Sequence, residues 1–193
     1  MEHLASHTQI TRLPSSRNDL HHYLLLDGVK MEPVLKWVYQ FVNNPEWYPL
    51  YKNTRYHDVI DISPCLVKIP TDSDIANQFD NELGPQGKAI FLSSSLDIDA
   101  LGISLSKLLW ITTDNGQYLH FRFYDPLTLS RLIPSLQIEE CAKLYSGIGN
   151  IVWFDVKQDT WQMLTISHSS KGTDRLGGVT FKPEWIDAIV STD

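Results

Sequence analysis

The stretch LHFRFYDP, residues 119–126, combines a strand pattern with an abrupt stop. Phe121 and Phe123 alternate with charged or amphipathic neighbours, which is the period of a strand with one buried face, and aromatic side chains suit a pleated surface. Asp125 and the proline after it predict the start of a helix, because proline fits the first helical turn and the aspartate can cap free amides. We therefore expect a strand that leads directly into a helix, with Arg122 near the junction.

Arg122 and Asp125 carry opposite charges close to this junction. A strand-end arginine beside a helix-capping aspartate most often makes a structural ion pair. The alternative is that Arg122 presents its planar guanidinium group to a carboxylate or a backbone carbonyl of a partner. The sequence favours the structural pair.

Upstream of this stretch, predicted strands alternate with predicted helices. The apolar run at 21–26 ends at Asp27-Gly28 and is typical of a central strand covered on both faces. Apolar spacing, caps and stops predict these further elements: helices at 33–42, 73–83 and 97–108, and strands at 65–69 and 88–92. The first half of the chain is therefore expected to contain βα units.

Hairpins dominate the second half. The dipeptide at 115–116 is Asn-Gly, a strong hairpin signal, and it separates strands expected at 109–113 and 118–124. A second hairpin is expected from strands at 150–156 and 160–167. Short helices are expected after Pro126, at 138–145 and from Pro183. Together the elements predict a mixed α/β fold, with a mixed β-sheet and helices packed on its faces.

The chain has 193 residues, of which 42% are hydrophobic, so it can bury the core of one domain. We expect an N-terminal arm at 1–18 and a mixed α/β domain at 19–168. The remaining residues, 169–193, predict a loop and a short C-terminal helix, which either docks on the domain or begins a truncated helical region.

Composition argues against several classes of protein. The formal charge is −7 and the Lys and Arg residues are scattered singly, which argues against a nucleic-acid partner. Cys65 and Cys141 show no spacing typical of a metal site or a disulfide framework, so we expect neither metal nor cofactor. The N-terminus lacks a signal-peptide pattern, and no apolar run reaches the about 18 residues of a membrane span. We expect a cytoplasmic protein.

No segment predicts a catalytic site. The sequence GISLS at 102–106 lacks the second glycine of a nucleophile elbow and lies in a helical pattern. His3 and His7 have the spacing of two metal ligands on a helix, but no third ligand is indicated. Asp97 and Asp99 are explained by helix capping. From the residues alone, no catalytic mechanism can be derived.

Three stretches, in their order and spacing, resemble one known family: YLLLDGVK at 23–30, the segment that runs from YPL to SPCLV between residues 48 and 67, and FRFYDPLTL at 121–129. The chain resembles the Tap/TEC-type effector adaptors, or chaperones, of bacterial type VI secretion, a family first catalogued as a domain of unknown function beside VgrG spike genes. The resemblance covers about residues 23–153, and FRFYDP is its most specific part.

The resemblance implies a non-catalytic cytoplasmic protein that binds a toxic effector protein and loads it onto the C-terminal part of a VgrG spike. Longer members continue into a helical C-terminal region, so this chain is either a compact member or a truncated one. The family pattern falls on the following residues, most of which we expect to shape the domain: Asp27, Gly28, Pro64, Leu66, Ser93, Ser94, Arg122, Tyr124, Asp125 and Pro126.

An aromatic-rich segment is the predicted anchor for a partner. Trp and Tyr dominate binding energy at protein interfaces, although the same rings could instead fill the core beside the first helix. An edge strand of the late hairpin, 150–167, is a second candidate, because it could pair with a partner strand. The predicted partner-binding residues are Trp47, Tyr48, Tyr51, Arg55, Tyr56 and Arg122.

Two further functions remain open at the level of sequence. An immunity-type protein that plugs a toxin is consistent with the acidic balance. A small hydrolase or transferase could use Arg122, Asp125 and a serine from 93–95, and this reading requires a concave pocket that joins those residues.

Overall fold

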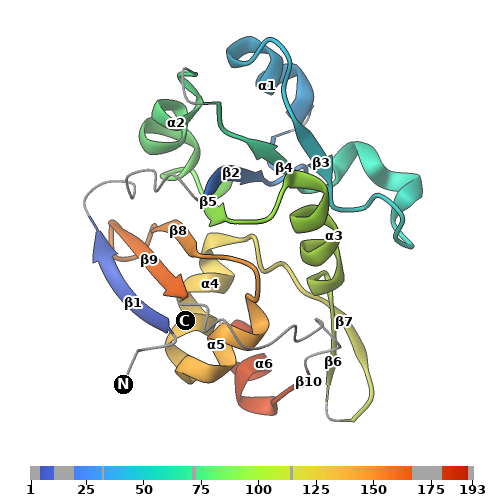
Figure 1. The fold of residues 1–193 in the computed structure, drawn as a ribbon. Helices are drawn as coiled ribbons and strands as arrows, with labels where there is room; N and C mark the ends of the chain where they lie inside the picture. The colour runs from blue at the N-terminus through green and yellow to red at the C-terminus, as the bar shows by residue number, and fades with distance from the viewer. Residues whose placement is uncertain are drawn as a thin grey trace.

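A seven-stranded sheet organises the protein (Figure 1), for which a computed structural model describes residues 5–10, 20–31, 33–70, 73–113, 115–166 and 180–190. All its neighbouring strands are antiparallel. In spatial order the strands are β1 (Ala5–Ile10), β9 (Thr160–Ile166), β8 (Asn150–Asp155), β5 (Ala89–Ser94), β2 (His21–Leu26), β4 (Cys65–Lys68) and β3 (Trp47–Pro49). The predicted fold of helices packed on the faces of a β-sheet is confirmed, but this main sheet is antiparallel throughout, and parallel pairing occurs in a smaller sheet.

Helices cover both faces of this sheet. In Figure 1, α1 (Val34–Phe41) and α2 (Ile75–Gln78) lie above the central strands, and α2 continues into a π-helical turn, η2 (Phe79–Leu83). A 3₁₀ segment, η1 (His57–Ile62), precedes β4. The other face carries α3 (Ile98–Leu108), α4 (Pro126–Leu132), the 3₁₀ turn η3 (Ile133–Ser135), α5 (Ile138–Leu144) and α6 (Pro183–Val190).

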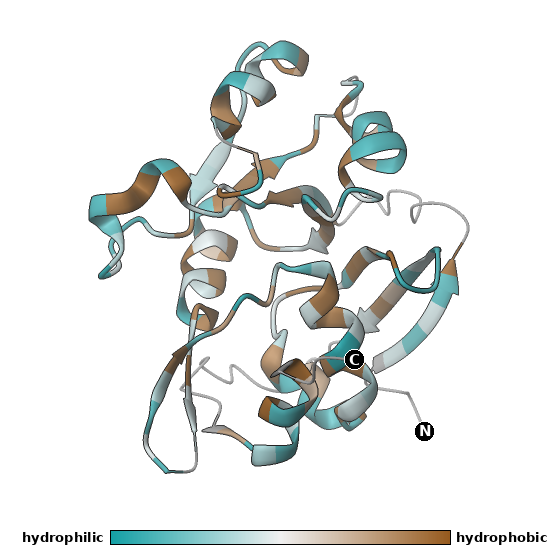
Figure 2. Cartoon of the chain, turned by 180° about the vertical axis from the view of Figure 1, so that it is seen from behind, coloured by the Kyte–Doolittle hydropathy of each residue, from teal (hydrophilic) through white to brown (hydrophobic). Residues whose placement is uncertain are grey.

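Strand β2 shows why the molecule has two layers of core. Tyr23 and Leu25 pack into the cluster under α3 to α6, whereas Leu24 and Leu26 pack into the cluster under α1 and α2. Successive side chains of a strand point to opposite faces, so a continuous apolar run must be covered on both. All four side chains are fully buried, which confirms the predicted central strand. In Figure 2 the central strands are accordingly hydrophobic, whereas α2 is largely hydrophilic.

A second, three-stranded sheet holds the predicted first hairpin, formed by β6 (Trp110–Thr113) and β7 (Tyr118–His120), with β10 (Thr180–Phe181) parallel to β6. The prediction that the second strand continues to residue 124 is wrong. The Phe121 amide still donates to the Leu109 carbonyl at 2.8 Å, but the chain then turns, and the Asp125 amide donates to the Arg122 carbonyl at 3.0 Å.

Burial explains this difference. Phe121 and Phe123 are buried as the alternation predicts, but Tyr124 is buried as well, so the period of two is broken at the turn. The helix start is confirmed: the residue after Asp125 is the first of α4, and the Asp125 carboxylate accepts a hydrogen bond from the Thr128 amide at 3.0 Å.

The predicted N-terminal arm is wrong for residues 5–10. They form β1, which pairs with β9 from Ala5↔Ile166 to Ile10↔Trp161. The sequence carries little hydrophobic alternation there because most of its described side chains are exposed, and main-chain pairing holds the strand. The second predicted hairpin, β8 with β9, is confirmed. Its outer edge is occupied by β1, so the predicted acceptor edge at 150–167 is not free.

The last helix, α6, begins at Pro183 as predicted, and it docks on the domain. Trp185 is buried, and the Arg131 guanidinium donates to the Ile189 carbonyl at 3.0 Å. The predicted loop at 169–179 lies outside the described residues. Within the described part of the chain, no helix has both the length and the apolarity needed to cross a membrane.

Candidate functional site

The end of β2 forms a polar corner around Asp27. Its buried carboxylate accepts hydrogen bonds from the amides of Val29 at 3.1 Å and Lys30 at 3.3 Å, which fixes a tight turn after the strand. The other carboxylate oxygen forms an ion pair and a hydrogen bond with the Arg122 guanidinium. Asp27 therefore shapes its own turn and holds the segment that leads into α4.

The predicted ion pair between Arg122 and Asp125 is wrong, because each residue has another partner. Arg122 pairs with Asp27, and the Lys30 ammonium donates to the Asp125 carboxylate and to the Gly87 carbonyl, each at 2.8 Å. Burial alone would raise the pKa of Asp125, but its hydrogen bonds with Lys30 and the α4 amide hold this pKa below its usual value. The corner thus contains the close ion pairs Arg122–Asp27 and Lys30–Asp125, and a longer one of 3.9 Å between the Lys30 ammonium and the Asp27 carboxylate.

Gly28 brings a second segment of the chain to the corner. A Cβ atom on this residue would lie 2.2 Å from the Ser63 carbonyl oxygen and 2.5 Å from that of Ile62. Ser63 in turn accepts a hydrogen bond from the Tyr51 amide and donates one to the Pro64 carbonyl, both at 2.9 Å. The close backbone approach therefore requires glycine, and it fixes the segment before β4 beneath the turn.

Tyr124 joins this corner to the aromatic segment. Its ring lies 5.5 Å from the Arg122 guanidinium carbon, and it shares a side-chain hydrogen bond with Tyr51. Three stretches far apart in sequence, Asp27-Gly28, Ser63-Pro64 and 122–126, consequently meet at one place.

Beside Tyr51, a group of rings continues toward the second sheet. Tyr56 stacks on Trp110 with a centroid distance of 4.9 Å, and His120 meets Tyr56 edge-on at 5.4 Å. The exposed Arg55 lies over the Trp110 ring at 4.3 Å. Burial and the positive charge of Arg122 lower the pKa of His120, which favours its neutral form.

The structure divides the predicted aromatic anchor into two groups. Tyr48 and Tyr51 are only 3% and 7% exposed, so they are core residues and the expectation that they offer themselves to a partner is wrong. Tyr48 packs on α3, where a Cβ atom at Gly102 would come within 2.5 Å of its ring. Trp47 is 38% exposed on the edge strand β3, and Arg55 is also exposed. These two residues remain available for contact.

The other family-pattern residues are structural. Leu66 lies in the core on β4, and Ser93 and Ser94 are fully buried on β5. The Asn150 amide donates to the Ser93 hydroxyl at 2.8 Å, and the Ser94 hydroxyl donates to the Gly147 carbonyl. The serines lie at the opposite end of β5 from the corner, because Asp27 contacts Lys88 just before this strand begins. That separation is about 17 Å for a strand of this length.

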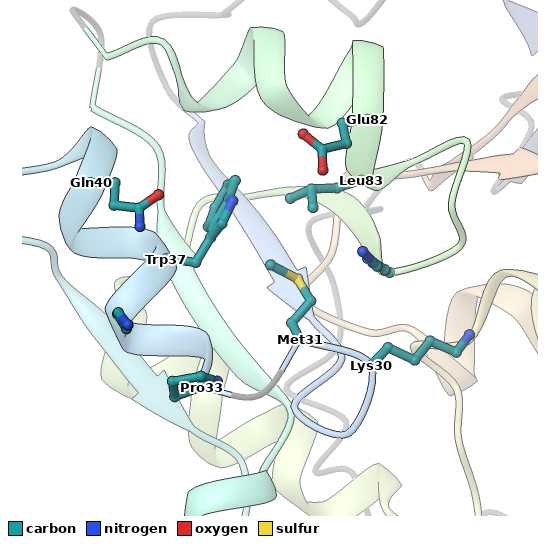
Figure 3. Close-up of a pocket in the computed structure, with 9 residues that line it drawn as sticks. Lys30, Met31, Pro33, Trp37, Gln40, Glu82 and Leu83 are labelled. Atoms are coloured by element: carbon teal, nitrogen blue, oxygen red, sulfur yellow. The ribbon is translucent and has the colours of Figure 1, made fainter.

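A groove next to the corner escaped the sequence reasoning. It lies between α1 and η2, has a volume of about 300 Å³, and reaches the corner through Lys30 (Figure 3). Its basic residues are scattered along the chain, so no charge run reveals it. Trp37 and Phe41 lie three and seven residues after Val34, on the same face of α1, so the sequence pattern assigns them to the core and gives no separate signal for a groove. The groove is lined by Lys30, Met31, Pro33, Lys36, Trp37, Gln40, Glu82, Leu83 and Lys88.

Comparisons with known proteins give one match. Residues 22–143 match the model of a family described as "Domain of unknown function (DUF4123)". The matched segment contains the whole corner and the whole groove, whereas β1, β8, β9, β10 and α6 lie outside it. No curated protein and no solved structure matches the chain. Among the described residues, no group of three or more His, Cys, Asp or Glu side chains is placed to hold a metal ion.

Proposed function

The chain belongs to the DUF4123 family, which is associated with effector adaptor and chaperone function in type VI secretion, and we propose that it binds a cognate effector and loads it onto a VgrG spike. In this proposal the protein acts in the cytoplasm, has two protein partners, and catalyses no reaction. The observation that carries the proposal is the convergence of the three family stretches at the Asp27 corner.

The residues around this corner suit recognition of a protein. The side chains of Lys30 and Arg122 are 36% and 42% exposed although both are ion-paired, so their outer atoms face solvent in a fixed geometry. Val29 and Leu127, each next to a corner residue in sequence, are exposed apolar side chains. Preorganised charges beside apolar contacts favour specific association, because little conformational freedom is lost on binding.

The hydrolase alternative lacks the arrangement that it requires. It needs a serine from 93–95 close to Arg122 and Asp125, but Ser93 and Ser94 are buried about 17 Å away along β5, and Ser95 follows at the end of the same strand. The hydroxyl groups of Ser93 and Ser94 are committed to Asn150 and Gly147. The described groove is lined by neither Arg122, Asp125 nor these serines, and its only link to them is Lys30, which binds Asp125.

The adaptor proposal is tested by affinity purification of the tagged full-length protein from its own host, followed by mass spectrometry. We expect a VgrG spike and an effector to co-elute. A toxin without a spike would favour the immunity-type function instead, and recovery of neither partner would contradict the proposal.

Variants then test the exposed part of the aromatic segment. The double variant Trp47→Ala/Arg55→Ala removes two exposed side chains, and we expect effector recovery to fall at least about tenfold, because Trp and Arg are the commonest interface hot spots. The matched control, Lys107→Ala/Val156→Ala, alters two exposed residues elsewhere and should leave recovery unchanged. Equal recovery with both variants would remove this segment from the interface.

A further inference from the structure

The groove between α1 and η2 is positively charged, although the whole protein is acidic. Lys30, which Asp125 offsets, Lys36 and Lys88 line it against one described acidic residue, Glu82, so a positive charge remains. The formal charge of the chain is −7, so this local excess of positive charge runs against the average surface. A site of this kind attracts negatively charged groups by charge complementarity.

Two of these lysines have no partner within the described part of the chain. Lys30 is committed to Asp125 and Gly87, but the ammonium groups of Lys36 and Lys88 make no ion pair or hydrogen bond with any described residue. Unpaired ammonium groups at the rim of a groove can bind carboxylates without first breaking an internal ion pair.

The floor of the groove is apolar. Leu83 is buried, and Met31 and Trp37 are partly covered, with the Trp37 ring packed on Phe41 at a centroid distance of 4.8 Å. Figure 3 shows the side chains of Met31, Trp37 and Leu83 turned toward the same space. Tryptophan and methionine are enriched at protein interfaces, and methionine adapts to the shape of a partner.

The shape of the groove favours a polypeptide over a small molecule. Only Leu83 among its lining side chains is buried, and Pro33, Lys36, Gln40 and Glu82 are exposed. Small-molecule sites typically enclose most of their ligand, and an open groove of this kind does not. It can accept one or two side chains of a longer segment that passes across it.

The wall formed by η2 has an unusual backbone. The Gly84 amide donates to the Phe79 carbonyl at 2.9 Å, which closes a π-helical turn that contains Glu82 and Leu83. Single π turns are rare and frequently occur at functional sites. This turn is a second observation, independent of charge, that marks the groove.

We propose that the groove binds a short acidic segment of a protein partner, with an aliphatic or aromatic side chain on the floor formed by Met31, Trp37 and Leu83 and carboxylates at Lys36 and Lys88. The inference rests on the proposed function only in taking the partner to be a protein. In this proposal the groove captures an acidic linear motif, and the adjacent corner holds Lys30 in place.

The test is a selection of short random peptides displayed on phage against the purified full-length protein. The same selection is run on Lys36→Glu/Lys88→Glu and on a control with an equal charge change, Lys107→Glu/Lys143→Glu, whose lysines are exposed on α3 and α5. The proposal expects peptides that are rich in Asp and Glu around an apolar residue, recovered by the wild type and the control but not by the groove variant.

Affinity and location are then measured with one synthetic peptide from the selection. We expect the groove variant to bind it at least about tenfold more weakly than the control variant does, because like charges then face each other. We also expect the peptide to shift the indole NMR signal of Trp37, assigned with Trp37→Phe.

Three results would overturn the inference: no enriched peptide, enriched peptides without acidic residues, or equal binding by the groove variant and the wild type. Circular dichroism verifies that both charge variants are folded. Because the peptide experiment uses the isolated protein, its failure is distinct from a failure to recover effector and spike from the host.

Discussion

Asp27 and Gly28 show how two adjacent residues can determine the geometry of a surface. The aspartate uses one carboxylate oxygen for its own turn and the other for Arg122, and the glycine lets the turn lie against the Ile62 and Ser63 carbonyls. Neither role requires contact with a partner. We infer that the family pattern at these positions reflects construction of the corner.

A Gly28→Ala substitution should destabilise the protein by about 2 to 3 kcal/mol, because the added Cβ atom would overlap backbone oxygens that cannot move independently. Urea unfolding measures the change. The control is Val29→Ala, since Val29 is 59% exposed and its substitution should alter the free energy of unfolding by less than about 0.5 kcal/mol. Equal stability of the Gly28→Ala variant and the wild type would contradict the close packing.

The Lys30–Asp125 pair should make stability dependent on pH in the acidic range. The pKa of Asp125 is lowered in the folded state, so its ionised carboxylate stabilises the fold above the unfolded-state pKa of about 3.9. This stabilisation is lost as the pH falls through the folded-state pKa. Because the pair is partly exposed, Lys30→Met should lower the free energy of unfolding by only about 1 kcal/mol at pH 7, and by less at pH 3.

Urea unfolding of wild type and Lys30→Met at pH 7, 5 and 3 tests this expectation. Part of the cost, the lost hydrogen bond to Gly87, does not depend on pH. The Lys36→Met control, which has no described partner, should show no such trend. A difference between wild type and Lys30→Met that stays constant with pH would argue against the ion pair.

At the level of elements, the two edges of the large sheet differ. The edge at β3 has three residues and ends in Pro49, and short strands with proline resist pairing with other chains. At the other edge lies β1, with six residues, which covers the longer strand β9. β1 therefore protects the hairpin that the sequence alone presents as a free acceptor.

Deletion of residues 1–10 should expose the β9 edge and cause self-association, because unpaired main-chain groups of a long strand recruit another strand. Size-exclusion chromatography measures the association, and hydrogen exchange should show loss of protection in β9. Thr8→Ala, which keeps the main chain of β1, is the matched control. A deletion variant that stays monomeric with unchanged protection of β9 would show that β1 is dispensable.

At the level of the whole molecule, one sheet supplies both layers of core. Strands β2, β4, β5 and β8 contribute side chains to the cluster under α1 and α2 and to the cluster under α3 to α6. If the helices that cover either cluster unfold, the apolar side chains on that face of the same strands become exposed to water.

We therefore expect the protein to unfold in one cooperative transition. Far-ultraviolet circular dichroism, near-ultraviolet circular dichroism and tryptophan fluorescence should give coincident curves in urea. Two separated transitions would show instead that the layer with α1 and α2 unfolds independently of the rest.

Much of the local structure follows from short stretches of the amino-acid sequence. The continuous apolar run of β2, the Asn-Gly hairpin and the Asp125 cap before α4 were predictable, because each depends on neighbours in the chain. Periodicity also gave the fold class, since strands and helices with apolar faces have few ways to cover one another.

The ion pairs, the buried tyrosines and the groove depend on how distant elements pack. Packing pairs Arg122 and Asp125 with other residues instead of with each other. It also buries Tyr48 and Tyr51 and brings Lys36 and Lys88 to one groove. Periodicity reports which face of an element is apolar, but not which distant element covers it. Ion pairs and grooves form between whichever groups the packed elements bring within reach, and that distance in space is not encoded by any local pattern.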